Sequence, residues 1–228
     1  MKKVFTILLF IFIIHCESRA QIIPQGFLMS PVIPSVVIGT QTWMLRNLDV
    51  STFRNGEQIH QVVSTTSIPT WVSYGTNLTA AWVYNNYDAN NNEAYGKLYN
   101  FYAVNDSRGI CPVGWHVPSQ NEWMVLVNYS GTDTSNGGKK LKESGTTHWA
   151  SSSMTVATNT TGFTALGAGY MGSAGSSSGS LTYLGYFWTS TINGSTASYI
   201  HMEDNRASVN VATNGNMRGG FSVRCIHD

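Results

Sequence analysis

Cys111-Pro-Val-Gly-Trp-His-Val-Pro-Ser-Gln-Asn-Glu-Trp123 is the stretch of this chain with the clearest structural signal. Ser119 is followed three residues later by Glu122, which is the spacing of a capping box. In that motif each side chain accepts a hydrogen bond from the other residue's backbone N–H. The proline before Ser119 sharpens the boundary because it disfavours a helical conformation in the residue ahead of it. The pattern predicts a helix over about residues 120–129. Its buried face would consist of Trp123, Leu126 and Val127.

Segments on either side of this helix indicate short strands and turns. Residues 36–45, with Gly39-Thr40 in the middle, predict a β-hairpin. Residues 98–104 have apolar side chains at helical spacing and predict a short helix, and residues 139–143 predict one or two further turns. Residues 71–87 are rich in aromatic side chains but lack a regular period. Further strands are expected over 163–171, 185–191, 199–203, 208–212 and 221–226, with a turn at Asn214-Gly215. Short strands, two or three short helices and long loops predict a single α+β domain.

The first twenty residues have the features of a secretory signal peptide. Two lysines are followed by an apolar run over residues 4–14, too short to span a bilayer, and then by small residues at Ser18 and Ala20. We therefore expect cleavage before Gln21. An alternative is lipidation of Cys16, although the two residues ahead of it are not small. No later stretch is long and apolar enough for a membrane helix, so no transmembrane segment is expected in the mature chain.

The predicted organisation is a signal peptide over residues 1–20, an extended linker over 21–35 and one domain over 36–228. Removing the charged residues of the signal leaves 10 basic (13 − 3) and 11 acidic (12 − 1) residues, a formal charge of −1. A nearly neutral chain without a basic stripe is not expected to bind nucleic acid or an anionic membrane. Because charged residues make up only 11% of the chain, Ser, Thr, Asn and Gly must cover much of the surface.

Several motifs, in order along the chain, resemble one protein family. They are Ile38-Gly-Thr-Gln-Thr-Trp-Met44, Tyr95-Gly-Lys-Leu-Tyr-Asn-Phe-Tyr-Ala103, the Cys111–Trp123 stretch, Gly137-Gly-Lys-Lys-Leu-Lys142, Gly162-Phe-Thr-Ala-Leu166, Gly185-Tyr-Phe-Trp-Thr-Ser190 and Gly220-Phe-Ser-Val-Arg-Cys-Ile226. Together they resemble the Fibrobacter succinogenes major paralogous domain family. The resemblance implies a bacterial surface or secreted protein and leaves the biochemistry undefined. Two of the motifs are also similar to sulfatase-modifying enzymes and to the C-type-lectin-like fold, so a C-type-lectin-like arrangement is expected.

Two cysteines, Cys111 and Cys225, remain after removal of the signal peptide. An even pair in an exported protein is typical of a disulfide, and the family resemblance points to the same pairing. The alternative is two buried free thiols. A bridge would join the last predicted strand to the segment ahead of the capped helix, and in the chain-entropy model it would contribute about 4–5 kcal/mol. Two lone cysteines do not make a zinc site.

Aromatic side chains suggest a surface for sugar rings. Four of the seven tryptophans lie in motifs that predict core packing: Trp43, Trp115, Trp123 and Trp188. Trp71, Trp82 and Trp149 lie in polar, loop-like surroundings. We expect these three, together with Tyr84, to present exposed aromatic faces to a ligand. The alternative is that each tryptophan packs beneath a loop.

A second candidate site is the acidic and amide cluster formed by Asp88, Asn90, Asn92 and Glu93. Carboxylate and amide oxygens are the ligands that calcium prefers, so the cluster predicts a weak calcium site. Gly96 is displaced from the position that a helix–loop–helix calcium loop requires. The alternative is a solvated asparagine-rich turn, and no other cofactor is expected.

Signatures of catalysis are lacking, since the histidines are scattered and no Gly-x-Ser-x-Gly motif occurs. The first hypothesis is therefore a secreted or cell-surface, non-catalytic domain that binds a glycan or another surface protein. Its variable face would be the loops over residues 64–95 and 144–184. The second is a structural subunit of an appendage or envelope complex, in which residues 21–35 pair with a neighbour by strand addition. A sulfatase-modifying type of enzyme is a distant third, because it would need a reactive cysteine pair where this chain has Cys225 alone. The oligomeric state is left open.

Overall fold

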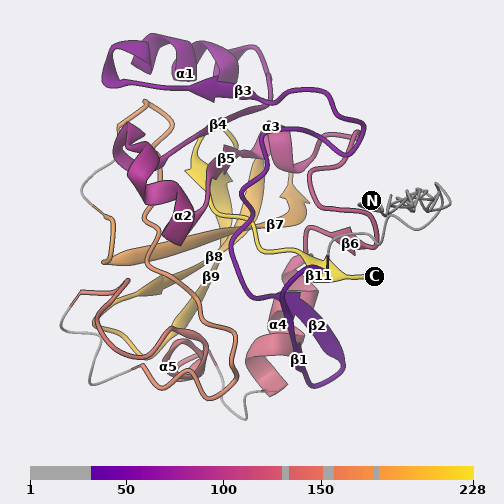
Figure 1. The fold of residues 1–228 in the computed structure, drawn as a ribbon, viewed down its shortest axis with the longest axis vertical. Coiled ribbons are helices and arrows are strands. Elements are labelled where there is room, and N and C mark those ends of the chain that lie inside the picture. The colour runs from indigo at the N-terminus through magenta and orange to yellow at the C-terminus, as the bar shows by residue number, and fades with distance from the viewer. Residues whose placement is uncertain (1–31, 130–133, 151–156, 177–179) are drawn as a thin grey trace, which may run out of the picture. The chain divides into compact units, whose positions relative to one another are not determined.

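The computed structural model describes residues 32–129, 134–150, 157–176 and 180–228. The predicted signal peptide, the alternative lipidation site at Cys16 and most of the predicted linker lie outside the described residues. Residues 33–228 form one unit of short strands, mostly antiparallel, and short helices, which is the predicted α+β class (Figure 1). Within the described ranges, no helix is long and apolar enough to cross a membrane. The predicted likeness to C-type lectins stays a prediction.

One sheet joins the first hairpin of the domain to its last strand. Its strand order is β1-β2-β11-β6, and all of its neighbours are antiparallel. The strands are β1 (Ser35–Ile38), β2 (Gln41–Met44), β6 (Trp115–His116) and β11 (Ile226–His227). β1 and β2 confirm the predicted hairpin. Because β11 pairs with both β2 and β6, the end of the chain lies between the hairpin and the segment that leads into the capped helix (Figure 1).

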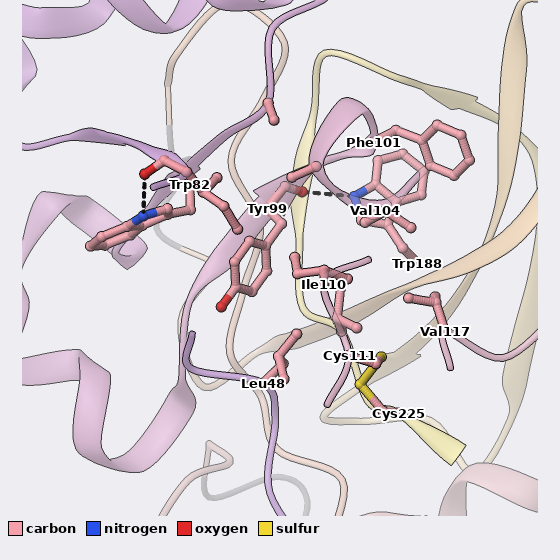
Figure 2. Close-up of a cluster of buried hydrophobic side chains, with 14 of the residues drawn as sticks. Leu48, Trp82, Tyr99, Phe101, Val104, Ile110, Cys111, Val117, Trp188 and Cys225 are labelled. Atoms are coloured by element: carbon pink, nitrogen blue, oxygen red, sulfur yellow. Dashed lines mark hydrogen bonds between the residues drawn. A yellow bond between two sulfur atoms is a disulfide. The ribbon is translucent and has the colours of Figure 1, made fainter. Parts of the chain in front are cut away.

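A disulfide closes the same region covalently. Cys111 and Cys225 are 114 residues apart in sequence and their sulfurs are bonded, as Figure 2 shows. The predicted pairing is confirmed. Both residues are buried, with exposed fractions of 2% and 0%. The bridge therefore belongs to the core.

Arg224, next to the disulfide, is fully buried. Its guanidinium donates hydrogen bonds to the Asn47 side-chain oxygen at 2.8 Å and to the Phe163 carbonyl at 2.7 Å. Its charged plane also lies 4.5 Å from the centre of the Phe163 ring. A planar fork of donors can satisfy several carbonyls at once, which is why arginine suits this position. The side chain thus connects three segments that are far apart in sequence.

A second sheet has the order β10-β5-β4-β3. Its strands are β3 (His60–Val62), β4 (Ala81–Val83), β5 (Leu98–Asn100) and β10 (Gly220–Phe221). β3 and β4 run parallel, and the crossover between them contains η1 (Thr65–Ser67) and α1 (Ile68–Thr76). Residues 71–87, for which no element was predicted, therefore include most of a helix and a whole strand. A proline in the first turn of α1 is tolerated because the N–H it lacks would have no helical partner.

The predicted helix over residues 98–104 is half wrong, because the segment divides into β5 and α3 (Phe101–Val104). Asn100 causes the change. Its side-chain oxygen accepts from the N–H of Ala103 at 3.1 Å, which caps α3, and from the N–H of Ala81 at 3.0 Å, which attaches the cap to β4. The tertiary contact to β4 decides where the strand ends.

The third sheet is an antiparallel meander of three longer strands, β7 (Leu184–Asn193), β8 (Thr196–Glu203) and β9 (Val209–Asn216). They confirm the strands predicted over 185–191, 199–203 and 208–212. The predicted turn at Asn214-Gly215 is wrong, because both residues lie within β9. A Cβ at Gly215 would lie 2.7 Å from the Ala197 carbonyl, so this glycine serves close packing in the sheet.

Two further strand predictions need correction. Residues 163–171 form no strand and pair only through single bridges at Ala165, Gly169 and Met171. The segment over 221–226 does not continue the antiparallel meander. It meets β7 through a parallel bridge between Ser222 and Phe187, and its ends, Phe221 and Ile226, belong to β10 and β11 of the other two sheets. Apolar runs of this kind show burial and do not show which partner supplies the hydrogen bonds.

Helix α4 (Gln120–Tyr129) confirms both the predicted range and the capping box. The N–H of Ser119 donates to the Glu122 carboxylate at 2.7 Å, and the N–H of Glu122 donates to the Ser119 hydroxyl at 3.2 Å. The predicted inner face is fully buried. The remaining short helices are η2 (Asn85–Tyr87), η3 (Ala89–Asn91), α2 (Asn92–Tyr95) and α5 (Gly137–Leu141).

The core is rich in aromatic rings. Trp188 stacks on Phe221 with ring centres 4.1 Å apart, and its indole N–H donates to the Tyr99 carbonyl at 2.8 Å (Figure 2). A neighbouring cluster contains Trp43 and Trp123, whose ring centres are 4.9 Å apart. The four tryptophans predicted to be core residues are buried, with exposed fractions of 0–7%.

Candidate functional site

The prediction that Trp71, Trp82 and Trp149 are exposed is wrong. Their exposed fractions are 1%, 3% and 1%, and they belong to three different clusters of the core. Each indole N–H donates to a backbone carbonyl, at distances of 2.8–3.2 Å. A loop carbonyl can satisfy the single donor of tryptophan, so polar neighbours in the sequence do not imply exposure. The three side chains therefore do not form one open surface.

The geometry around residues 88–93 does not support a calcium site. Asp88 accepts hydrogen bonds from the N–H and side-chain amide of Asn90 and thereby caps η3. The side-chain oxygen of Asn92 accepts from the Lys97 ammonium at 3.3 Å, which places a cation where calcium was expected. Among the described residues, no group of three or more His, Cys, Asp and Glu side chains could hold a metal ion. Glu93 instead lines a cavity described below.

Two of the predicted ligand-binding residues, Trp82 and Tyr84, do lie together. Their rings meet edge to face with centres 5.0 Å apart. They border a cavity of about 490 Å³, which we call the Tyr84 cavity. Its lining consists of Ser51, Gln58, Ile59, His60, Gln61, Trp82, Tyr84 and Lys97. Trp82 is buried beneath it, whereas Tyr84 is partly exposed.

Lys97 is a buried cation at this cavity. It forms an ion pair with Asp49, and its ammonium lies 4.8 Å from the Trp82 ring centre and 5.6 Å from that of Tyr84. An ammonium near two aromatic faces is attracted by their negative faces, which holds both rings in place. The Trp82 indole N–H donates to the Ile59 carbonyl at 3.1 Å (Figure 2). This hydrogen bond prevents the Trp82 ring from turning freely.

Several polar side chains line the cavity beside the Trp82 and Tyr84 rings. Within the described part of the chain, the side-chain amides of Gln58 and Gln61, the Tyr84 hydroxyl and the Ser51 hydroxyl make no hydrogen bond in the protein. Gln58 and Gln61 are exposed. Sequence reasoning missed these residues, because the parallel pairing of β3 with β4 brings Gln61 opposite Trp82 across 20 intervening residues. The nearest local signal in the sequence is the Asn55-Gly56 pair, which is typical of a tight turn and precedes Gln58.

A second cavity, of about 690 Å³, is lined by Pro34, Leu45, Arg46, Asn90, Glu93, Ala94, Glu143, His148, Thr164 and Leu166. We call it the His148 cavity. The His148 Nδ1 lies 2.9 and 3.0 Å from the two carboxylate oxygens of Glu143. The imidazole also meets the Tyr95 ring edge to face at 5.2 Å. Burial raises the pKa of Tyr95, and the neighbouring Glu143 charge raises it further.

These features define a disulfide-closed α+β domain with two cavities that are lined in part by polar and charged side chains. The family model of the Fibrobacter succinogenes major domain matches residues 36–227, so this chain belongs to that family. The family resemblance of the motifs is thereby confirmed. No curated protein and no solved structure matches the chain.

Proposed function

We propose that this chain is a secreted or cell-surface, non-catalytic binding module of C-type-lectin-like character that takes a glycan at the Tyr84 cavity. The observation that carries the proposal is the partly exposed Tyr84 ring beside amide and hydroxyl groups that have no hydrogen-bond partner among the described residues. Aromatic rings pack on the C–H faces of sugars, and amides and hydroxyls exchange hydrogen bonds with sugar hydroxyls. The cavity volume, about 490 Å³, falls in the ordinary range for small ligands.

The lining also favours a neutral or weakly charged ligand. The lysine of the lining, Lys97, already forms an ion pair with Asp49 and therefore offers little net charge to an anion. Gln58 and Gln61 each provide one acceptor and two donors, which suits a ligand with several hydroxyls. Such a site would recognise hydroxyl geometry rather than charge.

A non-catalytic role is supported by the chemistry of the cysteines. The distant sulfatase-modifying alternative would need a reactive thiol near the last strand, and Cys225 is bonded to Cys111. A disulfide sulfur lacks the thiolate that acts as nucleophile.

A glycan array probed with the secreted chain, with and without chelator, tests the proposal. We expect binding to at least one class of neutral glycan, unchanged by chelator, because the described residues contain no group of three or more His, Cys, Asp and Glu side chains that could hold a metal ion. Tyr84→Ala should weaken that binding at least about tenfold, since it removes the stacking ring. The matched control is Tyr183→Ala, which removes a tyrosine that is 53% exposed and lies outside the cavity lining. A blank array, or equal binding by Tyr84→Ala and the unmodified chain, would contradict the proposal.

The second candidate is a subunit that assembles through strand addition. It is favoured by β1, which lies at the edge of its sheet and exposes 70% of Val37. An unpaired edge strand with an apolar side chain is a template for pairing with another chain. Native mass spectrometry tests this idea: Val37→Lys should abolish any oligomers of the unmodified chain, and monomers in both samples would exclude it.

A further inference from the structure

The lining of the His148 cavity includes four residues with hydrogen-bonding groups that are not paired with any described residue. In the ranges that the structure describes, the Arg46 guanidinium and the Glu93 carboxylate have no ion-pair or hydrogen-bond partner. The Asn90 amide nitrogen is used by Asp88, which leaves the Asn90 side-chain oxygen free. The His148 Nε2 makes no hydrogen bond in the same ranges. All four residues line one cavity and come from three separate segments of the chain.

Glu143 determines what the histidine can offer. Because the Nδ1 of His148 faces both oxygens of the Glu143 carboxylate, this nitrogen carries the proton. In the neutral imidazole the Nε2 is then a hydrogen-bond acceptor. Contact with the Tyr95 ring keeps the imidazole in this orientation. Glu143 and Tyr95 are therefore positioning residues for His148.

The unused groups form a distinctive set of one cation and three acceptors. Arg46 presents a fork of donors that matches a carboxylate. The Glu93 carboxylate, the Asn90 oxygen and the His148 Nε2 are acceptors, and an ammonium group carries three donors. The apolar lining of Leu45 and Leu166 suits an aliphatic group. A purely anionic ligand would be repelled by Glu93, and a purely cationic one by Arg46.

We propose that the His148 cavity is a binding site for a small zwitterion of the amino-acid type, with its carboxylate at Arg46, its ammonium at Glu93, Asn90 and His148, and its aliphatic side chain against the apolar lining. This site is separate from the Tyr84 cavity, since the two share no lining residue. It does not depend on the proposed glycan binding. The cavity volume, about 690 Å³, leaves room for a peptide as well as a single amino acid.

Isothermal titration calorimetry on the full chain tests the assignment with L-leucine, N-acetyl-L-leucine and L-leucinamide. We expect saturable binding of leucine to one site, and binding at least about tenfold weaker for each blocked form, because each loses one charge pair. A further titration with dileucine shows which kind of zwitterion the cavity takes. Tighter binding of dileucine than of leucine would identify a peptide as the ligand, and weaker binding would identify a free amino acid. Both results keep the proposal.

Two variants connect each ligand charge to its partner. Arg46→Gln should weaken leucine binding to the level of leucinamide and leave leucinamide binding unchanged. Glu93→Gln should weaken leucine binding to the level of N-acetyl-leucine and leave N-acetyl-leucine binding unchanged. Arg218→Gln, an exposed arginine outside the cavity, is the matched control and should bind leucine normally. Tyr84→Ala should also leave leucine binding unchanged. The proposal fails if leucine shows no saturable binding, if the blocked forms bind as well as leucine, or if Arg218→Gln loses as much affinity as Arg46→Gln.

Discussion

Glu122 has a double role that its position in the sequence only half reveals. One carboxylate oxygen accepts from the N–H and hydroxyl of Ser119, and the other lies 2.9 Å from the Nε2 of His116. The Nδ1 of the same histidine lies 2.7 Å from an Asp228 carboxylate oxygen. His116 therefore connects the start of α4 to the residue that follows β11. The imidazole fully satisfies both carboxylates only when it carries a proton on each nitrogen.

Ser119→Ala is expected to lower the free energy of unfolding by about 1 kcal/mol, because the N–H of Glu122 loses its acceptor at the helix start. Equilibrium urea unfolding measures this change. The control is Asn121→Ala, an exposed position in the first turn of the same helix, where little change is expected. Equal losses in the two variants would show that the cap contributes nothing specific.

The stabilising effect of His116 should depend on pH. Partial burial lowers the pKa of His116, but its hydrogen bonds to Asp228 and Glu122 outweigh this, so that the pKa lies above the ordinary value of 6.5. A base whose pKa is raised by folding stabilises the fold fully below its unfolded pKa and loses this contribution as the pH rises through its folded pKa. Glu122 stays ionised in this window, because burial raises its pKa less than the hydrogen bonds from Ser119 and His116 lower it.

We therefore expect His116→Gln to be more destabilising at about pH 5.5 than at about pH 8.5, in urea unfolding at both values. The comparison between the variant and the unmodified chain cancels the titration of other groups to first order. A constant difference between the two proteins across this range would show that the protonated imidazole makes no net contribution.

Two hairpin turns allow backbone strain and packing to be separated. Gly39, between β1 and β2, has φ +64, and Gly194, between β7 and β8, has φ +62. A Cβ at Gly39 would lie 2.7 Å from the Tyr129 ring, whereas nothing lies within 4 Å of a Cβ at Gly194. The Gly39 turn is therefore packed against the last residue of α4.

Gly194→Ala is expected to cost about 1 kcal/mol of unfolding free energy, from the positive φ alone. Gly39→Ala should cost clearly more, because the methyl group also displaces the Tyr129 ring. Thermal and urea unfolding of both variants measure the difference. Adding Tyr129→Ala to Gly39→Ala should recover part of the extra loss; if it recovers none, the hairpin does not depend on contact with α4.

For the molecule, the disulfide is the main covalent constraint. Replacing Cys111 and Cys225 together by alanine should lower the free energy of unfolding by about 2–5 kcal/mol. Without the bridge, the unfolded chain regains the conformational entropy that closure of the 114-residue loop removes. Urea unfolding of the oxidised chain and of the double variant measures this loss. A reductant should destabilise the unmodified chain and leave the variant unchanged. Similar midpoints for the oxidised chain and the double variant would contradict a stabilising role.

Features that depend on residues close together in sequence could be predicted, whereas features that depend on distant residues could not. The capping box at Ser119 and Glu122 involves neighbours in sequence, so α4 was predicted with correct bounds. Trp71 and Trp82 were misjudged, because the groups that cover them and accept from their N–H, at Gly172 and Ile59, lie 101 and 23 residues away. Polar neighbours along the chain carry no information about such partners.

The candidate sites show the same division. Tyr84 and Glu93 could be named as ligand-binding residues from their chemistry, although the proposed ligand of Glu93 changed from calcium to an ammonium group. Other residues that line the same two cavities could not be predicted from the sequence. Gln61 reaches the Tyr84 cavity through the parallel pairing of β3 with β4, and Arg46 reaches the His148 cavity from the segment after the first hairpin.

Local hydrogen bonding and apolar periodicity thus established the α+β class, the capped helix, the first hairpin and the meander, since each depends on residues a few positions apart. Cysteine count together with the family motifs established the disulfide. Long-range packing alone established which side chains meet around the two cavities. These contacts form where segments from the whole chain bury their apolar surface against one another. The free energy of that burial depends on all of the packed residues together.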